Sequence, residues 1–486
     1  MRLKDYVRYD AVGLAELVHK GEVSPIEIIN AALAAIDRIN PAVNAAFLVD
    51  ADLAFDTARQ VDTSAPLAGV PFLIKDVNVF VSEWPTTFAS RFFSGAQPKG
   101  DSEIVTRWRE AGLIFLGKSN TPEFAEDAVT ETTWRGVTYN PWDKGVTVGG
   151  SSGGAAAAVA SGMVPVAHGT DVGGSIRIPA ACCGLFGLKP TRGLNPVGPH
   201  YPEIGAGLNA DHIISRSVRD SAALLDVTAG PELAGRYVVR KSVPSYLAAL
   251  EQPIQNLRIA YIRRAPGGIA VDTEILAAVE DVARQLEALG HHIEPCEFPA
   301  LVEEDIGSSS LWMMEVAGEV GRRAKELGRG PLCNELEAAS WAILQNVQRM
   351  TALDLAGARQ RAHEVTVAMA QHFRSFHLIL TPTLATLPPA LGIIDGRSAD
   401  FEYEAWVKAG RRFAPFSEIF NVTGQPAASL PMSHAKNGLP IGIQLVARQG
   451  EDHLLLALSA QLEAADGWLD RHPPIWAGAI DNTEAN

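Results

Sequence analysis

The sequence predicts an α/β protein organised on one large sheet with crossover helices. Short apolar runs bounded by glycine or proline read as strands at 67–76, 112–120, 257–262, 377–383 and 439–447. Amphipathic segments of helical period lie between them. Glycine and proline are dispersed and form no linker, so we expect residues 1–486 to be a single domain.

The N-terminal part, 1–65, is expected to be mainly helical. Ser24 is placed to cap a helix that has Pro25 at its first position and Glu27 at its third. We expect Pro41 to stop this helix, because proline lacks the N–H that continues the hydrogen bonding.

The remaining chain divides into three parts. Residues 66–230 contain the densest motifs, and 356–486 return to helix and strand signals that complete the core. Residues 300–355 look helical, carry Trp312, Met313, Met314 and Trp341, and show few strand signals. We expect 300–355 to form a helical cap over a substrate pocket, although such residues also serve as ordinary core packing.

Composition excludes several classes of protein. The net charge of −15 disfavours a nucleic-acid surface. The N-terminus has no apolar signal region, and no uncharged apolar run reaches the ~20 residues that span a bilayer. The four cysteines, none at metal-finger spacing, are typical of reduced thiols: Cys182, Cys183, Cys296 and Cys333. We therefore expect a cytoplasmic monomer or homodimer that binds a small molecule and no nucleic acid, membrane or metal.

Two glycine-rich loops stand out, GGSSGG at 149–154 and GTDVGGS at 169–175. Glycine lets backbone N–H groups approach an anion closely, either a phosphate or a developing oxyanion. The first loop lacks the lysine of a P-loop and the spacing of a dinucleotide-binding fingerprint. Nucleotide binding is therefore disfavoured.

Two serine-hydrolase patterns also occur. Gly149 to Gly153 fits G-x-S-x-G, but the strand before it is weak and no later histidine lies in a suitable loop. Ser433 to Lys436 fits S-x-x-K without its companion motifs. Both matches are expected by chance in a chain of this length and composition.

A third arrangement uses both loops. If the backbone turns sharply from Val172 to Ser175, its N–H groups converge beside the Ser175 hydroxyl and form an oxyanion hole next to a nucleophile. Ser151 could relay the proton of that hydroxyl. Lys75, at the end of an apolar strand, could accept it, because burial favours the neutral amine.

An ordered set of motifs now points to a family. GVPFLIKD at 69–76, the two glycine loops, CGLFGLKPTRG at 183–193, FNVTGQPAASLP at 420–431 and PIGIQLVA at 440–447 resemble the amidase signature enzymes. The similarity covers nearly the whole chain. It favours the free-standing branch, which includes hydrolases of nylon-oligomer cyclic dimers, aryl acylamides and urethanes.

The resemblance implies the amidase signature fold, a large twisted mixed sheet flanked by helices on both faces. It also implies a triad of Lys75 as base, Ser151 as relay after a cis peptide bond from Gly150, and Ser175 as the acylated nucleophile. The oxyanion hole would comprise the backbone of Val172, Gly173, Gly174 and Ser175. A pair that ties down this loop, structural and not catalytic, would be Asp171 and Arg177.

Four residues are expected to bind substrate. The segments of Thr87 and Ala125 resemble the family's substrate channel, and we add Gly150 from the first glycine loop and Met313 from the apolar 300–355 segment. It implies no cofactor and no metal. The expected reaction is hydrolysis of an amide, or of a similar carbamate or ester, on a small hydrophobic or aromatic molecule. The alternative within the family is an amidotransferase subunit that releases ammonia from glutamine for tRNA-dependent amidation.

Overall fold

Eleven strands form one mixed sheet through the centre of the protein, as a computed structural model shows for residues 1–303, 306–398 and 400–479. The predicted α/β sheet is confirmed. Its strand order is β1-β3-β2-β6-β8-β7-β12-β13-β11-β9-β10. The bounds are β1 (Ala46–Val49), β2 (Pro71–Lys75), β3 (Ile114–Ser119), β6 (Val166–Asp171), β7 (Phe186–Lys189), β8 (Ala210–Ser215), β9 (Arg258–Tyr261), β10 (His292–Pro295), β11 (Leu378–Pro382), β12 (Ala427–His434) and β13 (Pro440–Ala447).

Parallel pairing occurs on both sides of the sheet, in β3-β2-β6 and in β11-β9-β10. The strands between β6 and β11 pair antiparallel. A separate hairpin joins β4 (Glu131–Thr132) and β5 (Gly136–Val137). The parallel strands β2 and β6 end at the same edge, so residues that follow them are brought together.

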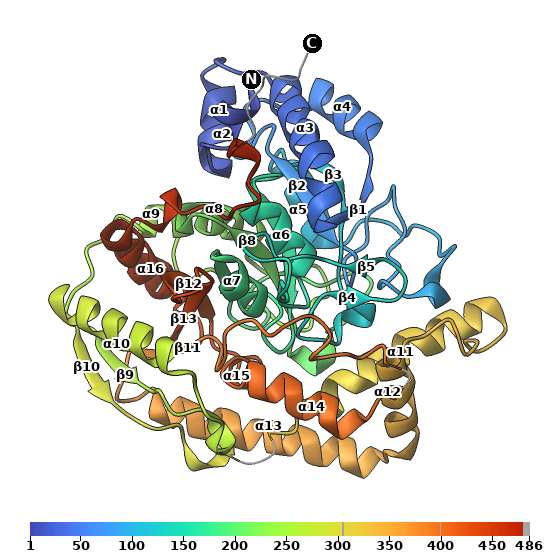
Figure 1. The fold of residues 1–486 in the computed structure, drawn as a ribbon, viewed down its shortest axis with the longest axis vertical. Coiled ribbons are helices and arrows are strands. Elements are labelled where there is room, and N and C mark those ends of the chain that lie inside the picture. The colour runs from blue at the N-terminus through green and yellow to red at the C-terminus, as the bar shows by residue number, and fades with distance from the viewer. Residues whose placement is uncertain (304–305, 399, 480–486) are drawn as a thin grey trace.

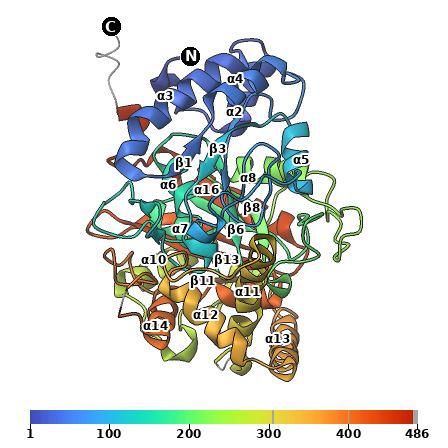
Figure 2. The same ribbon diagram turned by 90° about the vertical axis from the view of Figure 1, so that its right-hand side faces the viewer.

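Helices cover the sheet and extend beyond it at both ends (Figures 1 and 2). At one end lie α1 (Leu3–Tyr6), α2 (Ala11–His19), α3 (Pro25–Val43) and α4 (Ala51–Gln60). At the opposite end lie α11 (Ser308–Leu327), α12 (Ala338–Arg349), α13 (Ala352–His372) and α14 (Tyr403–Phe413). The others are α5 (Glu103–Glu110), α6 (Gly153–Ala160), α7 (Arg177–Cys183), α8 (Val218–Thr228), α9 (Tyr246–Ala249), α10 (Thr273–Ala288), α15 (Glu418–Thr423) and α16 (Asp452–Asp466).

The start of α3 follows its predicted capping, and its end does not. The Ser24 side chain accepts from Glu27 N, and the Glu27 carboxylate accepts from Ser24 N at 2.9 Å. The helix passes Pro41 and ends at Val43, with Asn44 left-handed at φ 51°. The predicted stop at Pro41 is therefore wrong. Proline in the last turn removes one N–H bond close to where the helical bonding ends in any case.

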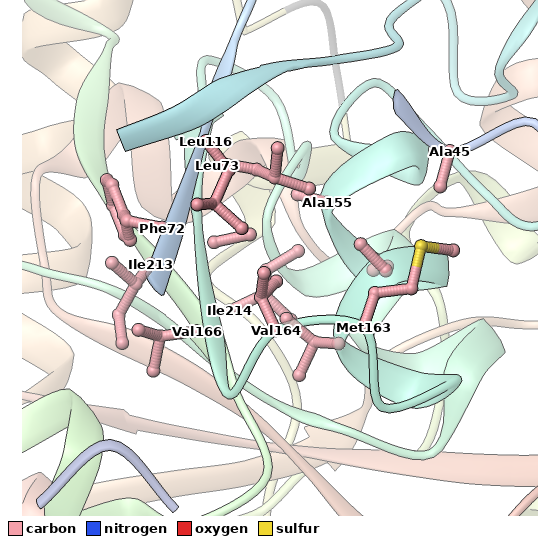
Figure 3. Packing of buried hydrophobic residues seen from close by; sticks show 14 of the residues in the cluster. Ala45, Phe72, Leu73, Leu116, Ala155, Met163, Val164, Val166, Ile213 and Ile214 are labelled. Atoms are coloured by element: carbon pink, nitrogen blue, oxygen red, sulfur yellow. The ribbon is translucent and has the colours of Figure 1, made fainter. Parts of the chain in front are cut away.

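Helix α6 lies inside the protein, and every one of its residues is buried. Its Ala155 lies beside Leu73 of β2, whereas Phe72 points to the other side of the strand (Figure 3). A helix that is apolar on all sides is stable only in such a core. Since the glycine–serine loop precedes α6 directly, this burial fixes that loop against the end of β2.

The segment predicted as a helical cap consists mainly of α11 and α12, and its residues 304–305 lie outside the described ranges. Within those ranges, no helix is long and apolar enough to cross a membrane. The cysteines carry free thiols, with Cys182 and Cys183 fully buried beside the glycine–serine loop.

Candidate active site

Lys75 is the last residue of β2 and is completely buried. Its Nζ lies 2.7 Å from Ser151 Oγ, 3.0 Å from Ser152 Oγ and 2.8 Å from Thr170 Oγ1. Ser152 is the N-cap residue directly before α6, and Thr170 lies near the end of β6. The ends of two neighbouring strands and one buried helix thus surround the amine with hydroxyl groups.

No carboxylate of the described residues forms an ion pair with Lys75. By contrast, the equally buried Lys118 of β3 is paired with Asp76 at 3.1 Å. Burial without a counter-ion lowers the pKa of Lys75 to about 7, against an opposing influence of the Asp211 and Asp171 charges. A large fraction of this amine is therefore neutral at neutral pH.

The hydrogen bonds around Lys75 define which neighbour can donate to it. The Ser152 hydroxyl donates to Thr170 O at 3.3 Å and accepts from Thr170 N at 3.2 Å. Its single hydrogen is thus engaged, so Ser152 Oγ accepts from the lysine. A neutral amine has two hydrogens and one lone pair, which leaves the lone pair for Ser151 or Thr170. Ser151 is the closer of the two.

The peptide bond between Gly150 and Ser151 is cis, as the family resemblance implied. Only glycine fits before this bond, because a Cβ at position 150 would lie 2.5 Å from the Val129 carbonyl oxygen. Gly150 therefore serves close backbone packing. It is not among the residues that line the cavity described below.

Ser175 lies in the loop between β6 and α7, and this loop is held by a buried ion pair. Asp171 receives bonds from Arg177 Nε and Nη2, both at 2.9 Å. Arg177 also donates to Ser417 O, the Gln444 side chain and the Asn421 side chain. Burial raises the pKa of Asp171, but the Arg177 charge and these bonds outweigh it and lower the value to about 2. This geometry matches the tying role expected of the pair.

The predicted set of four oxyanion donors needs a correction at Gly174. Gly174 N donates to Asp171 Oδ1 at 2.7 Å, so its hydrogen is engaged. The N–H groups of Val172, Gly173 and Ser175 donate to no atom of the described residues. Gly174 has φ +129°, and a Cβ there would lie 2.3 Å from Ser417 Oγ. It shapes the turn while its three neighbours keep free donors.

Ser151, Thr170, Val172, Gly173 and Ser175 all line one cavity of about 1240 Å³, its open mouth included. Ser175 O accepts from Ser152 N at 3.1 Å, which places the second loop directly on the first. The structure therefore brings the lysine and both serines to one site. Single faces of α11 and α14 contribute Ser309, Trp312, Glu315, Val316, Glu319, Trp406, Val407, Gly410 and Arg411, and segments around Phe88, Phe124 and Ile204 contribute much of the remainder.

The four residues predicted to bind substrate are placed differently from one another. Ala125 lies on the cavity wall. Thr87 and Met313 do not, because the Thr87 hydroxyl bonds to Asp76 at 2.6 Å and Met313 is buried against Tyr403. The neighbour of Met313 along α11, Trp312, takes the wall position instead. Helix rotation decides which of two adjacent apolar residues faces the cavity, and the sequence alone did not reveal it.

Several wall residues have little sequence signal. Phe88, Phe124 and Trp406 come from segments far apart in the chain and meet only in the folded protein. Thr170, one residue before Asp171 in the second loop motif, is the exception. Its position beside the glycines could have identified it.

Comparison with known proteins agrees with this geometry. The chain matches the family model described as Amidase over residues 27–456. It is 35% identical to a 6-aminohexanoate-cyclic-dimer hydrolase of Paenarthrobacter ureafaciens, covering 96% of each chain, and 33% identical to an acylamidase of Rhodococcus erythropolis, covering 95% of this chain and 96% of that one. A solved structure of 6-aminohexanoate cyclic dimer hydrolase complexed with substrate superposes with a TM-score of 0.92 at 34% identity, covering 96% of this chain and 99% of the other.

Proposed function

Because the chain belongs to the amidase signature family and is a hydrolase that acts on amides, we propose that it does so through a serine-bound acyl-enzyme. Ser175 is the nucleophile, Ser151 the proton relay and Lys75 the base. The substrates are small amides with a hydrophobic or aromatic part, and chemically similar carbamates and esters.

The first half of the reaction forms the acyl-enzyme. Neutral Lys75 accepts a proton from Ser151, which accepts one from Ser175 as Ser175 Oγ attacks the substrate carbonyl carbon. The free N–H groups of Val172, Gly173 and Ser175 hold the negative oxygen that develops. The proton then returns through Ser151 to the leaving nitrogen, and the C–N bond breaks. Water attacks the ester by the same route in the second half.

The observation that carries this proposal is the state of Lys75. Its buried amine lies 2.7 Å from Ser151 Oγ and has no carboxylate partner in the described ranges. A buried lysine held in this way is a base near neutral pH, whereas an ion-paired lysine remains charged.

The substrate class follows from the cavity and from the relatives. Its wall combines aromatic side chains with several polar and acidic ones, which suits a molecule with an apolar body next to the polar amide. The names of the relatives make cyclic dimers of 6-aminohexanoate and acylamides the first compounds to assay.

A labelling experiment tests the nucleophile. A fluorophosphonate probe should modify Ser175 in the intact protein, and Ser175→Ala should abolish both labelling and amide hydrolysis. Labelling that persists at another serine would contradict the assignment. Assays with anilides, aliphatic amides, carbamates and glutamine in parallel define the range, and activity confined to glutamine would favour the amidotransferase alternative.

A further inference from the structure

Two turns on the cavity wall share an unusual backbone. Phe88 and Ala89 both have positive φ, 54° and 51°, and Phe124 and Ala125 repeat this with 50° and 58°. Each pair is a Phe-Ala dipeptide in the left-handed region, where asparagine or glycine is the usual choice. Such a conformation is kept by non-glycine residues where the surroundings enforce it, often at functional sites.

The two turns bring their aromatic rings together. Phe124 N donates to Phe88 O at 2.8 Å, and the two rings stack with centroids 5.8 Å apart and planes at 30°. Phe93, which is not on the wall, packs against both rings at 4.8 and 5.8 Å. Phe88 and Phe124 both line the cavity but are only 2% and 7% exposed, so they reach it through a small part of each ring. We call this buried pair the aromatic platform, with Phe93 as its support.

Buried bonds outside the cavity hold the first turn. Thr87 N and Oγ1 donate to the Asp76 carboxylate at 3.0 and 2.6 Å. Asp76 is completely buried and is paired with Lys118 at 3.1 Å and Arg135 at 2.8 Å. With its charge compensated in this way, Asp76 is a fixed anchor for the residue just before Phe88.

The second turn is held in the same manner. Glu123, directly before Phe124, accepts from Glu337 N at 2.7 Å and from the Ser340 hydroxyl, both on or beside α12. Each platform ring therefore follows a residue that is tied to a buried network. The rings are positioned in advance of binding.

Resting on the proposed amide hydrolysis, we propose that Phe88 and Phe124 determine specificity through aromatic contact with a planar ring of the substrate, and that Thr87 is a positioning residue for this platform. The platform lines the same cavity as Ser151 and Ser175, so a substrate ring that contacts it occupies the cavity of the proposed nucleophile. A planar aromatic ring makes edge or offset contacts with these rings that a puckered ring of similar size does not.

The test uses two substrates that differ in planarity, benzamide and cyclohexanecarboxamide, with release of ammonia as the readout. The native protein should favour benzamide in kcat/KM. Phe88→Leu and Phe124→Leu should each lower the ratio of the two values by about tenfold, mainly through KM for benzamide. A native protein without preference, or leucine variants that lose both activities equally, would overturn the proposal. If a leucine variant does not fold, methionine at that position removes the ring and keeps the bulk.

Thr87→Val tests the positioning role and has a matched control. It should lower the ratio of kcat/KM for benzamide to kcat/KM for cyclohexanecarboxamide by about threefold, although Thr87 is not on the wall. Thr121→Val also removes a buried hydroxyl, but the Thr121 hydroxyl has no partner in the described residues, so the ratio should stay unchanged. Equal ratios for the two valine variants would refute the positioning role. Fluorophosphonate labelling of Ser175 is scored separately, so failure of the proposed mechanism is distinguishable from failure of the platform.

Discussion

The two sides of the cavity are built in different ways. The catalytic side consists of strand ends and short glycine loops, where Lys75, Ser151 and Asp171 are fully buried and hydrogen-bonded to neighbours. The helical side, formed by faces of α11 and α14, has Trp312 partly exposed and Arg411 open to solvent. Chemistry requires fixed donor and acceptor geometry, whereas recognition requires a surface whose side chains can change without disturbing the site.

Replacement of the proposed triad residues should give the largest loss of activity. It is therefore the strongest test of the difference between the two sides of the cavity. Lys75→Met and Ser175→Ala should each lower kcat by about 10³-fold or more, because the relay acts as a unit. Trp312→Ala on the helical side should lower kcat/KM by only about tenfold and change the order of substrates. Steady-state kinetics on one anilide and one aliphatic amide measures both. A Lys75→Met enzyme with near-native kcat would show that another group is the base.

Removal of the buried ion pair should lower the free energy of unfolding more than removal of a surface ion pair does. Arg177→Met leaves Asp171 charged and buried, so it should cost about 3–5 kcal/mol of unfolding free energy. The control, Arg284→Met, breaks the exposed pairs with Glu280 and Asp281 and should cost at most about 1 kcal/mol. Urea unfolding monitored by circular dichroism gives both values. Similar losses in the two variants would mean that the catalytic loop is not specially dependent on its pair.

The residues that meet on the proposed catalytic side could be identified from the sequence through motifs that resemble the family, and their catalytic roles stay a prediction. Lys75, Ser151 and Ser175 lie in short motifs, and the geometry of the Asp171 and Arg177 pair is contained within one turn and the start of α7. Strands β2, β3, β9, β11 and β13 were likewise accessible through their apolar runs, whereas β6 and β8, which carry no such bounded run, were not predicted. The Gly174 donor was predicted incorrectly, since the competing carboxylate of Asp171 is visible only once the loop has its shape.

The helical side was far less predictable. That Trp312 and not Met313 faces the cavity depends on the rotation of α11 against its neighbours. Thr87 was expected at the substrate, yet its hydroxyl is committed to Asp76. The strand order and the meeting of Phe88 with Phe124 depend on contacts between distant segments, for which periodicity gives no information.

The pH dependence of activity tests the charge state on the catalytic side. Because burial lowers the pKa of Lys75 from 10.5 to about 7, kcat/KM for a neutral amide should fall about tenfold per pH unit below 7 and level off above it.

The free energy of unfolding should also depend on the protonation of Lys75. The unfolded chain binds the lysine proton up to pH 10.5, so the folded state loses stability from Lys75 as pH falls from 10.5 towards 7. Lys75→Met should therefore gain most stability, relative to the native protein, at pH 7 and below. An activity profile that is flat down to pH 5 would contradict a lysine base.

The smallest effect is expected from Arg411, whose side chain lines the cavity mouth and pairs with no carboxylate in the described part of the chain. Glu315, Glu319 and Glu418 lie on the same wall, so Arg411 partly offsets their negative field. Arg411→Met should leave kcat for neutral amides within about twofold, since no hydrogen bond within the described residues links Arg411 to Lys75, Ser151 or Ser175. It should lower KM for an amide that carries an ammonium group by about two- to threefold, and 0.5 M salt should remove this gain through screening. A large drop in kcat for neutral substrates would contradict the separation of chemistry and recognition between the two sides, because the helical side would then take part in the chemistry.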